Sequence, residues 1–165
     1  MSYGYDAVGN RTSITYPDGN IVHYQYDALS RLSQVTDWSS QTTTSGYDAA
    51  GNLVSAVYPN GTSTAYAYDA AGRLLNVTNR TGEKVNSAYT YVMDKVGNRL
   101  EVASYNEGVE RYGYDRLYRL TSWTSPSRQA VRYAYDPVGN RLSMTEPTGT
   151  VNYAYDVADE LLRCV

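Results

Sequence analysis

Residues 5–27 read YDAVGNRTSITYPDGNIVHYQYD, which is one complete repeat followed by the start of the next. Successive copies of its opening dipeptide are separated by 21, 21, 21, 25, 21, 21 and 20 residues. Self-similarity at a fixed period is the sequence signature of a repeat architecture. Residues 1–165 are therefore predicted to form a single array of eight units of about 21 residues. The dipeptides are Tyr5-Asp6, Tyr26-Asp27, Tyr47-Asp48, Tyr68-Asp69, the degenerate Met93-Asp94, Tyr114-Asp115, Tyr135-Asp136 and Tyr155-Asp156.

A second tyrosine stands two residues before most of these dipeptides, and Ser45 is the exception. A period of two places both rings on one face of a β-strand. Nine residues after the tyrosine of each dipeptide a small or apolar residue recurs, which is predicted to fill the gaps between the tyrosine rows. The preceding tyrosines are Tyr3, Tyr24, Tyr66, Tyr91, Tyr112, Tyr133 and Tyr153; the ninth-position residues are Ile14, Val35, Ala56, Val77, Val102, Trp123, Met144 and Cys164.

The aspartate of each dipeptide opens a turn, and a glycine follows it three residues later in five units. An aspartate at the first position and a glycine at the fourth are preferred in a type I turn, where the glycine takes a positive φ. We expect the turns that lack this glycine to be strained or differently shaped. The glycines are Gly9, Gly51, Gly72, Gly97 and Gly139, and Ser30, Tyr118 and Asp159 replace them in the other units.

A second strand and a second turn, such as Tyr16-Pro17-Asp18-Gly19, complete each unit. The predicted fold is therefore all-β, a continuous antiparallel meander of about sixteen short strands without helices. The interval of 25 residues predicts a longer hairpin loop at residues 81–88, and the interval of 20 residues loses one residue near 148–152.

The composition argues against two classes of function, nucleic-acid binding and membrane spanning. The net charge is −3 and the charges are scattered singly, which argues against nucleic acid as a partner. No apolar run reaches the length of a membrane span. The chain has 19 Tyr, 2 Trp and no Phe, which predicts a thin or partly hydrated core. One cysteine excludes an internal disulfide, and no signal peptide is visible, so we expect a fragment or another route of export.

The repeat resembles the RHS repeat, also called the YD repeat, along essentially the whole chain. The resemblance is carried by YDAVGNRTSITYPDGN from Tyr5, YDAAGRLLNVT from Tyr68 and YDPVGNRLSMTEP from Tyr135. The family includes bacterial Rhs polymorphic toxins, components of insecticidal toxin complexes, wall-associated bacterial proteins and teneurins. The resemblance implies a β-strip that spirals into a hollow shell, which encloses a toxin domain in some members and is an extracellular scaffold in others.

The resulting hypothesis is a non-enzymatic wall segment of an exported or cell-surface shell. Eight units would supply only part of such a wall. Its partners would be further repeats or copies of itself, and an enclosed toxin cargo. Two alternatives stay open: a filament subunit that adds head to tail through its open sheet edges, and a tyrosine-lined module that binds glycans.

Candidate catalytic and metal sites have simpler interpretations. Cys164 occupies an apolar ninth position and is predicted to be buried, while His23 is predicted to be solvated on the face opposite Tyr24. With one His and one Cys there is no zinc-ligand spacing, and no cofactor is predicted. Asp136-Pro137-Val138-Gly139 resembles the self-cleavage motif of Rhs toxins but lies in phase as an ordinary turn. Four sequons, at Asn10, Asn60, Asn76 and Asn79, are attributed to chance in a turn-rich chain.

Overall fold

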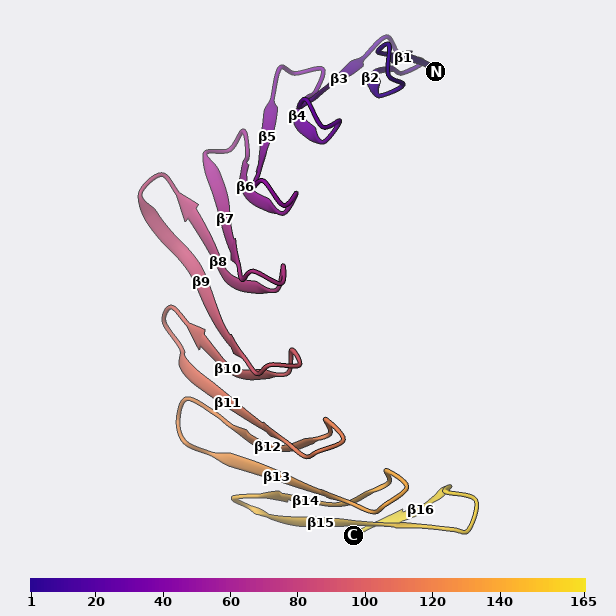
Figure 1. Cartoon of the computed structure of the whole chain (residues 1–165), viewed down its shortest axis with the longest axis vertical. Coiled ribbons are helices and arrows are strands. Elements are labelled where there is room, and N and C mark those ends of the chain that lie inside the picture. The colour runs from indigo at the N-terminus through magenta and orange to yellow at the C-terminus, as the bar shows by residue number, and fades with distance from the viewer. The chain divides into compact units, whose positions relative to one another are not determined.

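The computed structural model describes residues 1–165 and contains sixteen strands in one sheet, paired strictly in chain order (Figure 1). This confirms the predicted all-β antiparallel meander. The structure contains no helix that could span a membrane. The strands are β1 (Ser2–Tyr5), β2 (Arg11–Thr15), β3 (Ile21–Tyr26), β4 (Leu32–Thr36), β5 (Thr42–Tyr47), β6 (Leu53–Val57), β7 (Thr62–Tyr68), β8 (Leu74–Thr81), β9 (Lys84–Met93), β10 (Arg99–Ser104), β11 (Gly108–Tyr114), β12 (Leu120–Thr124), β13 (Ala130–Tyr135), β14 (Arg141–Glu146), β15 (Gly149–Tyr155) and β16 (Leu161–Cys164).

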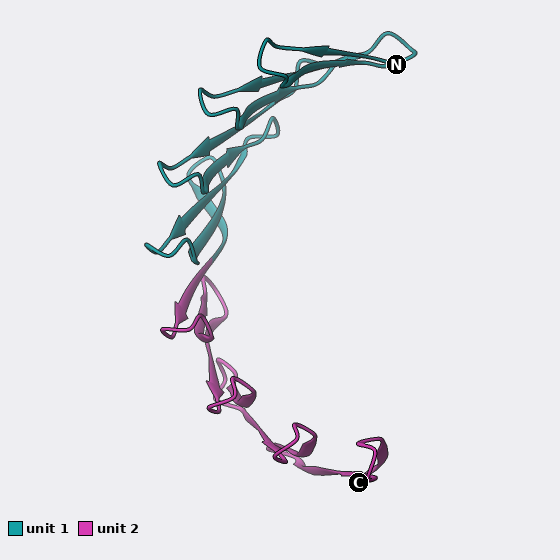
Figure 2. Ribbon diagram, turned by 45° about the vertical axis from the view of Figure 1, so that its right-hand side comes forward, with its two compact units in different colours: residues 1–88 teal, residues 89–165 magenta.

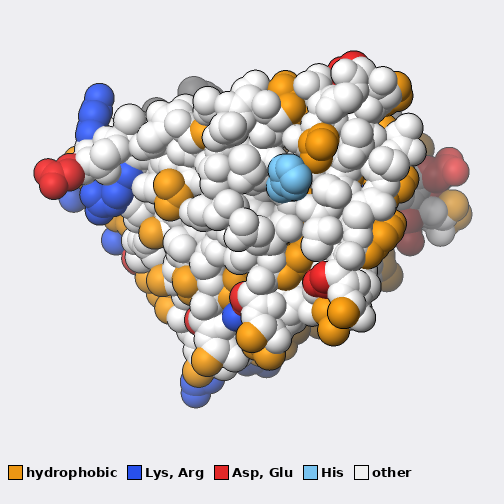
Figure 3. Space-filling view, turned by 90° about the horizontal axis from the view of Figure 1, so that it is seen from above, with side chains coloured by type: hydrophobic (Ala, Val, Ile, Leu, Met, Phe, Trp, Pro, Cys, Tyr) orange, Lys and Arg blue, Asp and Glu red, His pale blue; other side chains and the backbone are white.

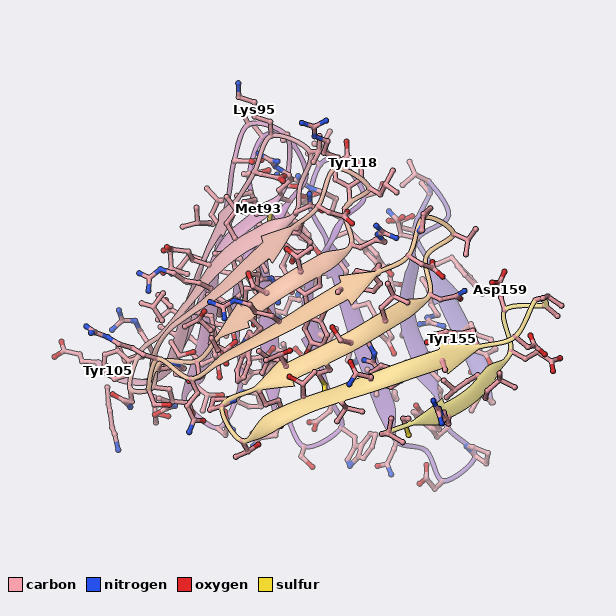
Figure 4. The ribbon with its side chains drawn as sticks, turned by 90° about the horizontal axis from the view of Figure 1, so that it is seen from below. Met93, Lys95, Tyr105, Tyr118, Tyr155 and Asp159 are labelled. Atoms are coloured by element: carbon pink, nitrogen blue, oxygen red, sulfur yellow. The ribbon has the colours of Figure 1, made fainter.

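The chain is grouped into two compact units, Met1–Ala88 and Tyr89–Val165, which Figure 2 colours separately. Each unit consists of repeated hairpins. We call the turn that follows each Tyr-Asp dipeptide the YD turn and the turn that follows the next strand the return turn. In the second unit, Figure 4 shows Met93, Tyr118 and Asp159 near one end of the strands and Tyr105 near the other. The two kinds of turn therefore lie at opposite ends of the strands.

Strand pairing in the first unit aligns the residues that the sequence assigned to one face. Tyr3 pairs with Ile14, and Ile14 pairs with Val22 on the next strand. The same register recurs in the second unit, where Tyr112 pairs with Trp123. The pairing slips by one residue just before the tyrosine of the dipeptide, as between Gly4 and Tyr5. A β-bulge therefore leads into the YD turn.

The core is thin because each unit is a single layer of sheet. No large side chain is fully buried, and the most protected side chains keep 5–8% of their surface exposed. Burial of apolar surface is therefore limited, and contacts between neighbouring strands and turns contribute much of the stability of the fold. The most protected residues are Ile14, Val22, Ala56 and Thr64 in the first unit and Val102 and Val131 in the second.

The YD turns without glycine have the same shape as those with it. Ser30, Tyr118 and Asp159 have φ of 59°, 63° and 62°, in the left-handed region that Gly51 occupies with φ of 92°. The amide of Ser30 donates to the carbonyl of Asp27 at 3.0 Å, as Gly51 does to Asp48 at 3.1 Å. The expected strain at these residues is therefore confirmed. The expected difference in turn shape is wrong, because the turn hydrogen bonds hold the backbone in the same conformation.

The predicted longer loop at residues 81–88 is wrong. The extra residues lengthen β8 and β9, and only Gly82 and Glu83 connect them. β8 continues to pair with β7 as far as Thr81 opposite Thr62, so the added backbone groups gain ladder hydrogen bonds that a loop would leave to water. In the shorter interval only Pro147 and Thr148 connect β14 and β15, so the shortening falls in this return turn.

Candidate functional site: the YD turns and their clamps

The aspartate of the dipeptide organises each YD turn through hydrogen bonds. In Asp48, Oδ1 accepts the backbone N–H of Asn52 at 2.8 Å, and Oδ2 accepts the side-chain N–H of Asn52 at 2.9 Å. The amide of Asp48 in turn donates to the carbonyl of Asn52 at 3.0 Å. Both carboxylate oxygens are thus committed to the turn. The degenerate unit folds in the same way, since Asp94 accepts both N–H groups of Asn98 although Met93 replaces the tyrosine.

These hydrogen bonds stabilise the charged form of the aspartates. The side chain of Asn52, followed by its backbone N–H, lowers the pKa of Asp48 below the ordinary value of 3.8. The backbone N–H and then the guanidinium of Arg73 lower the pKa of Asp69 in the same way. An aspartate of this kind is an acceptor at neutral pH and has no proton to give.

The same direction holds in most of the other units. In Asp94 and Asp136 partial burial is the largest single influence and raises the pKa, but the hydrogen bonds together outweigh it. Hydrogen bonds also lower the pKa of three further turn aspartates, Asp6, Asp27 and Asp115.

The residue five positions after the tyrosine alternates between asparagine and arginine, a pattern with no predicted role. The units carry Asn10, Arg31, Asn52, Arg73, Asn98, Arg119 and Asn140 in order, and Glu160 ends the series. The structure therefore has a longer period of two units. This alternation is visible in the sequence, but its meaning depends on which turns become neighbours in space.

The arginine type clamps two consecutive YD turns together. Arg31 Nε donates to Asp27 Oδ2 at 2.7 Å within its own turn, and its Nη1 donates to the carbonyl of Asp48 in the next turn at 2.9 Å. Its guanidinium also lies 4.7 Å from the ring centroid of Tyr47. Arginine suits this position because its planar fork donates several hydrogen bonds and stacks on an aromatic face.

Other links between turns follow the same plan. Arg119 repeats the clamp on Asp115, at 2.6 Å, and on the carbonyl of Asp136, at 2.9 Å. The asparagine type reaches the next turn through its side chain, since Asn140 donates to Asp159 Oδ1 at 2.7 Å. Each such link fastens one repeat to its successor.

Tyrosine hydroxyls close the gap where neighbouring strands diverge. Pairing of β2 with β3 ends at Ser13 opposite His23, which leaves the carbonyl of Arg11 without a ladder partner on that side. The hydroxyl of Tyr26 donates to this carbonyl at 3.0 Å. Tyr47, Tyr135 and Tyr155 make the equivalent bonds to the carbonyls of Leu32, Leu120 and Arg141, at 2.9, 2.9 and 3.1 Å.

The tyrosine that precedes the dipeptide is covered by arginine in several units. Arg11 lies 4.8 Å from the ring centroid of Tyr24, and Arg141 lies 4.3 Å from that of Tyr153. Tyr112 instead donates its hydroxyl to the carboxylate of Glu110, and burial, followed by this bond, raises its pKa. Many tyrosine faces and hydroxyls therefore already have partners within the sheet.

The remaining sequence candidates do not form a reactive site. Cys164 is exposed, so its predicted burial is wrong: β16 has a neighbouring strand on one side only. His23 is exposed on β3, as expected. The Asp136-Pro137-Val138-Gly139 segment forms an ordinary YD turn, in which the amide of Gly139 donates to the carbonyl of Asp136 at 3.3 Å.

Known proteins share this architecture. The chain resembles the pore form of the Photorhabdus luminescens Tc holotoxin, with 24% identity and a TM-score of 0.73 over 93% of this chain. It also resembles TcdB2–TccC3–TEV, with 23% identity and a TM-score of 0.74 over 99% of this chain. At this identity the likeness shows the fold alone, and the chain spans only 9–10% of the length of those two proteins.

A family profile extends these likenesses to the sequence itself. No curated protein sequence matches the chain. The profile described as RHS Repeat matches residues 3–44, 47–84 and 119–151, which together make up most of the chain. The chain therefore belongs to the RHS repeat family.

Proposed function

We propose that this chain is a non-enzymatic segment of the wall of an RHS shell that is exported or displayed at the cell surface. The observation that carries the proposal is the set of clamps between consecutive YD turns, of which Arg31 is the clearest example. Because links of this kind recur between consecutive repeats, as at Arg31, Arg119 and Asn140, further repeats could extend the sheet in the same way.

The chemistry of the repeated residues supports a structural role. The turn aspartates accept hydrogen bonds through both oxygens, as in Asp48, and many tyrosines are engaged by arginines or backbone carbonyls. Groups that are committed in this way hold the sheet together and are not poised to act on a substrate. Further RHS repeats and an enclosed toxin cargo are the partners that this role implies.

The test is to locate this segment in the protein from which it comes. An epitope inserted between Gly82 and Glu83, in the exposed connection of β8 and β9, is followed with a labelled antibody by electron microscopy. We expect the label on the wall of a hollow particle, and the antibody to detect the protein outside the cell or on its surface. A label on a solid particle, or on fibres, would reject the wall function and favour another assembly.

A further inference from the structure

A groove of about 330 Å³ lies between the first two return turns of the first unit and has no part in the wall contacts described above. Its lining includes Asn20, Ile21, His23, Thr36, Asp37 and Trp38. Figure 3 shows the histidine side chain, in pale blue, at the surface among largely uncharged side chains. The groove therefore combines one large aromatic ring with several polar groups that can exchange hydrogen bonds with a ligand.

Trp38 presents an open aromatic surface. Its side chain is 57% exposed although it contacts Tyr16, whose ring centroid lies 6.0 Å away at an angle of 80° between the ring planes. This edge contact orients the indole without stacking over it. Tyr24 and Tyr47 differ, because guanidinium groups already cover their rings.

Asp37 carries a free acceptor beside this ring. Its Oδ1 accepts the backbone N–H groups of Ser39 and Gln41 at 2.8 and 2.9 Å, as in a YD turn. Its Oδ2 has no hydrogen-bond partner, whereas Asp27 Oδ2 is occupied by Arg31. Gln41 stands where a YD turn has Asn or Arg, so the second oxygen stays available in the groove.

We propose that this groove binds a neutral sugar in the pyranose form. The axial C–H groups of such a ring are weakly positive and pack on the negative face of the indole. Its hydroxyls can donate to Asp37 Oδ2 and exchange hydrogen bonds with the exposed imidazole of His23. The carboxylate disfavours anionic ligands. The site is independent of the wall function and would give the assembly a means of attachment to glycans.

The test is saturation-transfer NMR on the intact chain with methyl β-D-glucopyranoside, whose ring hydrogens are all axial. We expect transfer to these hydrogens at millimolar sugar and none to glycerol, which has hydroxyls but no ring. Trp38→Ala should weaken binding at least about tenfold through loss of the stacking surface. Asp37→Asn keeps the Oδ1 acceptor of the turn and removes the Oδ2 acceptor, so it should weaken binding in a folded protein.

Tyr105→Ala is the matched control, because Tyr105 is also an exposed aromatic residue in a return turn, at 59% exposure, but lies outside the groove. It should bind like the unaltered chain. Absence of saturation transfer, or equal losses in Trp38→Ala and Tyr105→Ala, would overturn the proposal. Circular dichroism of each variant separates loss of the site from loss of the fold.

Discussion

Replacing Tyr118 by glycine should stabilise the protein, although the substitution removes a large side chain. Tyr118 has φ of 63° in its YD turn, where most of the other units use glycine (Figure 4). Its side chain is 59% exposed, so the ring buries little surface. Its amide still donates to the carbonyl of Asp115 at 3.1 Å, and glycine keeps that bond.

The expected magnitude is a difference of two backbone effects. A residue with a Cβ costs about 1–2 kcal/mol in the left-handed region, and glycine removes this cost. Glycine also makes the unfolded chain more flexible, which opposes stability by about 0.4–1 kcal/mol. Tyr118→Gly should therefore raise the free energy of unfolding by about 0.5–1 kcal/mol.

Urea denaturation checks this value, with the midpoint analysed by a nearest-neighbour treatment suited to repeat proteins. Gly139→Ala is the mirror experiment, because Gly139 has φ of 112° and no atom lies within 4 Å of the position that its Cβ would take. Gly139→Ala should lower the midpoint by a comparable amount. A lower midpoint for Tyr118→Gly would refute the argument and show that its ring contributes more than its strained backbone costs.

Three further predictions test the clamps. Tyr47→Phe should cost about 1 kcal/mol in urea denaturation, because the carbonyl of Leu32 loses its donor, while Tyr5→Phe in the first strand should be neutral. Arg31→Lys keeps the charge but loses the fork, so amide hydrogen exchange should accelerate in β5 and β6 and stay unchanged in the second unit. Acid should destabilise the fold. Hydrogen bonds hold the pKa of turn aspartates such as Asp48 below 3.8 in the folded chain, so the unfolded chain binds more protons as the pH falls. Urea midpoints should therefore show full stability above pH 3.8 and a decline below it. Equal stability at neutral and acidic pH would contradict this assignment.

Local order could be predicted from the sequence because the signals are short-range and recur eight times. The Tyr-x-Tyr alternation predicts strands, and an aspartate three residues before Gly51 predicts a turn, from bonds that close within five residues. Pairing in chain order follows from short connections. These features need no knowledge of distant residues, which is why the meander and its register agree with the structure.

Contacts between repeats depended on the tertiary structure. The sequence shows Arg31 five residues after a tyrosine, but only the folded sheet brings its guanidinium to the carbonyl of Asp48, seventeen residues away. The extra residues near Gly82 were assigned to a loop because their pairing partners lie on β7. Exposure of Cys164 likewise depends on which strands pair with β16 and not on its own residue type. Hydrogen-bond patterns within a turn are local, whereas burial and clamping depend on which strand comes to lie alongside.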